Sequence, residues 1–100
     1  MPVLEMVEKI TQRPELYVGN DVTLEKIHLF ISGYYVCGCE LGLNDTSFDD
    51  FSEFVARKYN EKRTVSWFRI IRYNAVSDKD AFETFVRLFR MFKKRIDAWR

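Results

Sequence analysis

The chain has few of the residue types on which catalytic and metal sites depend. Among 100 residues there are one histidine, two cysteines and four glycines. A single histidine, His28, supports neither a metal cluster nor a catalytic triad with an orienting partner. The simpler interpretation is a half-buried helix residue. The glycines match no phosphate-binding loop. We therefore expect no enzymatic activity, no metal ion and no cofactor.

Cysteines and long apolar runs are equally scarce. Cys37 and Cys39 are separated by one residue on a predicted helix, so their side chains diverge and cannot form a disulfide with each other. Free thiols are typical of a reducing compartment. No stretch approaches the roughly 18 apolar residues of a membrane-spanning helix, and no basic segment precedes an apolar run as in a signal peptide. These features predict a cytoplasmic protein that does not contact a membrane.

Proline occurs only at positions 2 and 14, so nothing interrupts helices in the rest of the chain. The spacing of apolar residues predicts an all-α fold, a compact bundle of about five helices in a single domain over residues 1–100. Aromatic residues make up 16% of the chain and supply enough apolar area for such a core. The helices are expected at about 2–13, 23–41, 47–59, 66–74 and 77–99.

Helix boundaries follow from capping residues. Thr23 is a predicted N-cap, and the patterns Ser47-x-x-Asp50 and Ser77-x-x-Asp80 resemble capping boxes. The segment 65–73 is rich in β-forming residues, but a strand would have no partner, so a helix is favoured there.

The helix predicted at 23–41 has an unusually wide apolar surface. Leu29, Tyr35 and Val36 extend the apolar arc around most of its circumference, which predicts a central helix enclosed by the others. Gly33 and Gly38 weaken a helix, and close approach of a neighbouring helix would compensate for them.

Charge is distributed unevenly along the chain. Residues 1–50 contain 3 Lys/Arg against 9 Asp/Glu, a net charge of −6, and residues 51–100 contain 13 against 6, a net charge of +7. An acidic cluster without intervening cations comprises Glu40, Asp45, Asp49, Asp50 and Glu53. Two interpretations stay open: the carboxylates complement helix N-termini, or they face a basic protein partner and speed its association.

A basic stripe lies on the last predicted helix. It consists of Arg87, Arg90 and Lys94, flanked by Lys93 and Arg95. The stripe is short, since Arg87 and Lys94 lie only about 10 Å apart along a helix. A solvated helix face is the simpler interpretation, and nucleic-acid binding through this helix is the alternative.

Several motifs resemble a family of small bacterial proteins. The family has a short first helix, a turn with the pattern R-P-x-M-Y-x-G and a helix with the pattern F-x-x-G-Y. The corresponding segments here are residues 13–19, 30–34, 51–59, 67–71 and 81–85. Leu16 stands where the family more often has methionine, a change that conserves volume. Within the turn, Arg13, Pro14, Tyr17 and Gly19 have an architectural interpretation, since Pro14 ends a helix and Gly19 can adopt a positive φ.

The family looks like the immunity proteins of contact-dependent growth inhibition and other polymorphic toxin systems. The resemblance implies a bacterial protein that binds a cognate toxin, of the nuclease type, and neutralises it as a stoichiometric complex. We expect the acidic cluster to contact the toxin. The alternatives are a nucleic-acid-binding or regulatory module acting through the basic last helix, and a helical adaptor that forms a homodimer through Trp67, Phe68 and Trp99.

Overall fold

The computed structural model describes residues 2–43 and 45–98. These residues form six α-helices and no strand, which confirms the all-α prediction. The chain divides into two compact units, Met1–Asp49 and Asp50–Arg100, each with its own core. They are described separately below, and the prediction of one domain over residues 1–100 stays a prediction.

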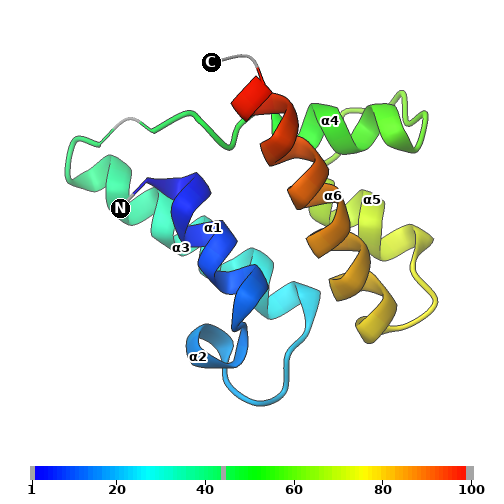
Figure 1. The fold of residues 1–100 in the computed structure, drawn as a ribbon, viewed down its shortest axis with the longest axis horizontal. Helices are drawn as coiled ribbons and strands as arrows, with labels where there is room; N and C mark the ends of the chain where they lie inside the picture. The colour runs from blue at the N-terminus through cyan, green and yellow to red at the C-terminus, as the bar shows by residue number, and fades with distance from the viewer. Residues whose placement is uncertain (1, 44, 99–100) are drawn as a thin grey trace. The chain divides into compact units, whose positions relative to one another are not determined.

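The first unit contains α1 (Val3–Gln12), α2 (Glu15–Val18) and α3 (Leu24–Glu40). Both α1 and α2 pack against α3, and α1 lies along it (Figure 1). The apolar face of α1 supplies most of the core, as its periodicity predicts. The buried apolar residues are Val3, Leu4, Met6, Val7, Ile10, Leu24, Ile27 and Ile31.

Local signals set both ends of α3. The Thr23 hydroxyl accepts a hydrogen bond from the Lys26 N–H at 3.2 Å, as expected of an N-cap. At the other end Gly42 has φ +78°, and the Leu43 N–H donates to the Gly38 carbonyl at 2.8 Å. This is a Schellman motif, in which a left-handed glycine satisfies the last carbonyls of a helix.

The turn after α1 contains a helix that the sequence does not predict. Pro14 precedes the single-turn helix α2 as its N-cap residue, and Gly19 ends it with φ +87°. The positive φ expected at Gly19 is confirmed. Tyr17 packs edge-on against Phe30 of α3, with ring centroids 5.6 Å apart, so the turn is fixed to the long helix.

The second unit contains α4 (Phe51–Lys58), α5 (Trp67–Asn74) and α6 (Asp78–Ala98), which all contact one another. Its core is largely aromatic. Phe51 is fully buried, and its ring lies within 6.4 Å, centroid to centroid, of five other rings: Phe54, Trp67, Phe85, Phe89 and Phe92.

Two predictions for this unit are confirmed and one is wrong. Residues 67–74 are helical, and Ser77 caps α6 by accepting a hydrogen bond from the Asp80 N–H at 3.0 Å. The helix predicted from Ser47 begins only at Phe51, after a turn. Ser47 does not cap it because its hydroxyl donates to the Asp45 carboxylate at 2.6 Å.

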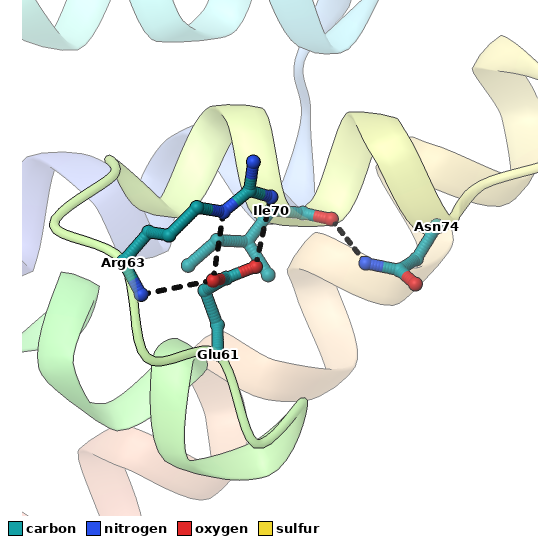
Figure 2. Close-up of polar contacts among 4 residues, drawn as sticks. All are labelled: Glu61, Arg63, Ile70 and Asn74. Atoms are coloured by element: carbon teal, nitrogen blue, oxygen red, sulfur yellow. Dashed lines mark hydrogen bonds and ion pairs between the residues drawn. The ribbon is translucent and has the colours of Figure 1, made fainter.

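Hydrogen bonds between two charged residues, Glu61 and Arg63, stabilise the loop between α4 and α5 (Figure 2). The Glu61 carboxylate accepts hydrogen bonds from the Arg63 backbone N–H at 2.9 Å and from its guanidinium at 3.0 and 3.2 Å. These bonds lower the pKa of Glu61 to about 2. Within α5, the Asn74 amide donates to the Ile70 carbonyl at 2.7 Å, which ties down the last turn.

Candidate protein-binding surface

The two units divide the predicted acidic cluster between them. Glu40, Asp45 and Asp49 belong to the first unit, where Glu40 is the last residue of α3 and the two aspartates follow in the next loop. Asp50 and Glu53 belong to the second, at the start of α4. Each part of the cluster therefore has its own surroundings, those of its own unit.

Asp45 has a structural role. One of its carboxylate oxygens accepts a hydrogen bond from the N–H of Val3, the first residue of α1, at 2.6 Å. The other accepts from the Ser47 N–H at 3.0 Å and from its hydroxyl. These bonds lower the pKa of Asp45, the Ser47 hydroxyl contributing most. Asp45 therefore caps a helix 42 residues away and is poorly placed to bind a partner as well.

Asp49 and Glu40 remain available around the C-terminal end of α3. Both are exposed, and neither takes part in an ion pair among the described residues. Asp49 lies close enough to Tyr35 of α3 to raise the pKa of its hydroxyl, with the Cys39 thiol adding to the effect. An exposed aromatic ring and two carboxylates thus share this end of the helix.

Asp50 and Glu53 lie in a mixed environment. They line a cleft of about 440 Å³ within the second unit, whose described lining is Asp50, Glu53, Phe54, Arg57, Phe92, Arg95 and Ile96. The Glu53 carboxylate pairs with Arg57 at 2.6 Å. Arginines offset the acidic charge here, so this part of the predicted cluster attracts cations less than the first unit does. The Asp50 side chain makes no capping hydrogen bond to α4. The predicted capping box is also absent, because the Ser47 N–H, which Asp50 would bind in such a box, donates to Asp45 instead.

An exposed apolar face of α3 was missed by the sequence analysis. Leu29 is 62% exposed and Val36 is 58% exposed, and Leu41 and Leu43, which follow the helix, are exposed as well. Apart from the neighbouring backbone of α3 itself, no described atom lies within 4 Å of the position that a Cβ at Gly33 would take. Within the first unit, no helix packs closely at Gly33, and α1 and α2 do not enclose α3 as the sequence predicts for a central helix. The apolar residues of α3 occur on both sides of the helix. Only packing against other helices distinguishes the buried side from the exposed side.

The residues of the turn motif lie in and around α2. Pro14 and Gly19 bound α2, and Tyr17 is half-buried against Phe30. The Arg13 side chain is 70% exposed and lies 3.9 Å from the Glu15 carboxylate. This surface ion pair contributes little to stability.

The basic stripe and the residues predicted to form a dimer surface all belong to the second unit. Arg87, Arg90 and Lys94 are all exposed on α6. Trp67 is buried between Phe51 and Phe85, so its assignment to a dimer surface is wrong. The other residues of that surface are Phe68, which is half-buried, and Trp99, which lies outside the described residues.

His28 is half-buried, and burial lowers its pKa against the opposing effect of Glu25. Cys37 and Cys39 are exposed free thiols.

Within residues 2–43 and 45–98, no group of three or more His, Cys, Asp or Glu side chains could hold a metal ion. None of the helices described has the length and apolar character needed to cross a membrane.

Comparison with protein-family models, with curated proteins and with solved structures gave no match to this chain. The resemblance to immunity proteins therefore rests on the motifs in the sequence.

Proposed function

We propose that the chain is a cytoplasmic immunity protein that binds a basic protein toxin and blocks its active surface. The observation that carries the proposal is the C-terminal end of α3. Two exposed carboxylates, Glu40 and Asp49, stand there with the exposed ring of Tyr35, in a unit with 3 Lys/Arg against 8 Asp/Glu and a net charge of −5. Complementary charge speeds association, and an exposed aromatic ring is a frequent anchor in protein interfaces.

The mechanism is occlusion, with no chemical step. A nuclease needs a cationic surface to hold its anionic substrate, and an acidic protein surface can cover that site. Stable protein interfaces bury roughly 1,200–2,000 Å² in total, which a 12.0 kDa chain can supply from one side. The partner would then be held as a one-to-one complex.

The test uses the gene immediately upstream of the one encoding this chain. We expect it to encode a large secreted protein with a toxic C-terminal domain. That domain, expressed alone in bacteria, should stop growth, and co-expression of this chain should restore it. The two purified proteins should form a one-to-one complex in size-exclusion chromatography with light scattering. A toxic domain that this chain neither binds nor neutralises would refute the proposal.

The charge-reversal variant Glu40→Lys/Asp49→Lys tests the acidic surface. We expect association with the toxin domain to slow by about tenfold at low salt, because surface charges act mainly on the on-rate. The difference should shrink as salt rises, since exposed charges are screened over about 10 Å at 0.1 M. Stopped-flow measurements at two salt concentrations would show this.

The control for this experiment is Glu5→Lys/Glu15→Lys, which makes the same change in net charge at two exposed positions on α1 and α2. It should slow association less. Wild-type association that does not respond to salt, with no effect of either reversal, would exclude electrostatic steering by the acidic surface.

A second candidate function rests on the second unit, which has 13 Lys/Arg against 7 Asp/Glu and a net charge of +6. The exposed stripe Arg87, Arg90 and Lys94 would there contact nucleic acid phosphates. If the stripe is only a solvated face, tRNA and duplex DNA should bind no more tightly than about 10⁻⁴–10⁻⁶ M at physiological salt. Nanomolar binding, lost when the three side chains are replaced by glutamine, would favour this function over the first.

A further inference from the structure

The outward side of α3 combines apolar and acidic residues in a regular order. Leu29 and Val36 are seven residues apart, two helical turns, and so lie on the same side of the helix. Ser32 and Gly33 lie between them, and all four residues are exposed. Two large apolar side chains thus flank two small residues, an arrangement in which a side chain of a second helix can pack between them.

Acidic residues stand at both ends of this stripe. Glu25 and Glu40 are exposed on the same side of α3, and 15 residues of helix place them about 22 Å apart. We propose that this face, defined by Glu25, Leu29, Ser32, Gly33, Val36 and Glu40, is the docking site for an amphipathic helix of the toxin. Basic residues near the two ends of that helix face Glu25 and Glu40. The inference rests on the proposed function and extends it by naming the partner's chemistry.

Charge argues against a second copy of this chain as the occupant. In an antiparallel pairing of two α3 helices, Glu25 of each copy faces Glu40 of the other, and in a parallel pairing each glutamate faces its equivalent. Both arrangements place like charges together, which is unfavourable.

Gly33 provides a test that separates docking from folding. A Cβ at this position meets nothing within 4 Å, so larger residues fit the free protein. Gly33→Ala should raise the thermal midpoint by about 4 °C, because alanine favours a helix over glycine. Gly33→Leu should also fold, and its side chain should occupy the space above Gly33 between Leu29 and Val36. We expect Gly33→Leu to weaken binding of the toxin domain by about tenfold without lowering the thermal midpoint.

A matched pair of valines tests the apolar part of the face. Val36 and Val76 are both exposed, but Val76 lies in the second unit, before α6. Val36→Asn should weaken toxin binding by about tenfold, and Val76→Asn should leave it unchanged within about twofold. The affinities would be measured by isothermal titration calorimetry with the toxin domain from the upstream gene.

The outcomes are distinguishable. If the wild-type chain does not bind the toxin domain, the proposed function and this inference both fail. If the wild type binds and the Gly33→Leu and Val36→Asn variants bind equally well, only this inference fails. It also fails if Gly33→Leu lowers the thermal midpoint, since the chain itself would then cover the face. A wild-type dimer in sedimentation equilibrium that Gly33→Leu dissociates would identify a second copy as the occupant instead.

Discussion

Replacing Phe51 with alanine should lower the free energy of unfolding by about 3–5 kcal/mol. The ring is fully buried and packs against five other aromatic rings, three of them on α6. Truncation removes its apolar contacts and leaves a cavity that rigid neighbouring rings fill poorly. A loss of this size is a large fraction of the 5–15 kcal/mol typical of a whole protein, so the variant should be close to unfolding. Urea denaturation followed by circular dichroism would measure it.

The matched control is Tyr73→Ala on α5. Tyr73 is also an aromatic helix residue of the second unit, but its side chain is 78% exposed. Its truncation should change the free energy of unfolding by no more than about 0.5 kcal/mol. Phe85→Ala should resemble Phe51→Ala, because Phe85 is buried against the same ring. A loss below about 1 kcal/mol for Phe51→Ala would contradict the packing described here.

Asp45→Ala should destabilise the protein by about 1–3 kcal/mol. The substitution removes the N-cap of α1 and the acceptor for two groups of Ser47. Losing an N-cap costs about 0.5–2 kcal/mol, and the loop loses further hydrogen bonds. Asp49→Ala in the same loop is the control, since Asp49 is exposed and caps no helix. It should change stability by about 0.5 kcal/mol or less.

The effect of Asp45 should depend on pH in a defined direction. Hydrogen bonds hold the pKa of Asp45 in the folded protein below its value in the unfolded chain. The stabilisation is therefore fully present above the unfolded pKa of about 3.9 and is lost as the pH falls through the lower folded pKa. The difference between wild type and Asp45→Ala, measured by urea denaturation, should be constant from pH 5 to 7 and shrink below about pH 4. An equal difference at pH 7 and pH 2 would show that the charge contributes nothing.

The candidate surface could be predicted only in part. Charge counts along the sequence indicated an acidic region around Glu40 and Asp49, which are indeed exposed. The sequence could not indicate that the Asp45 carboxylate is bound to α1. The pairing of Glu53 with Arg57 is different, because an i,i+4 spacing on a predicted helix is enough to indicate it. The sequence also assigned Leu29 and Val36 to the protein interior, because an apolar side chain has the same periodicity whether a neighbour covers it or not.

The sequence by itself determined five of the six described helices, all except α2, and those of their ends that depend on nearby residues. Thr23 and Ser77 cap helices that begin at the next residue, and Gly42 ends one by its own backbone conformation. Such interactions span three or four residues, so the pattern of residue types is enough to specify them.

Only the tertiary structure decided which distant groups meet. The first N–H of α1 is capped by Asp45, and the first N–H of α5 by Ser52 of α4, at 3.2 Å. Both caps come from residues far along the chain that approach only after the helices have packed. The packing of α1 and α2 also determined which side of α3 is buried. The opposite side stayed exposed, and it is the face that we propose as a docking site. The physical reason is that burial is a property of contacts between elements, and a local pattern contains no information about them.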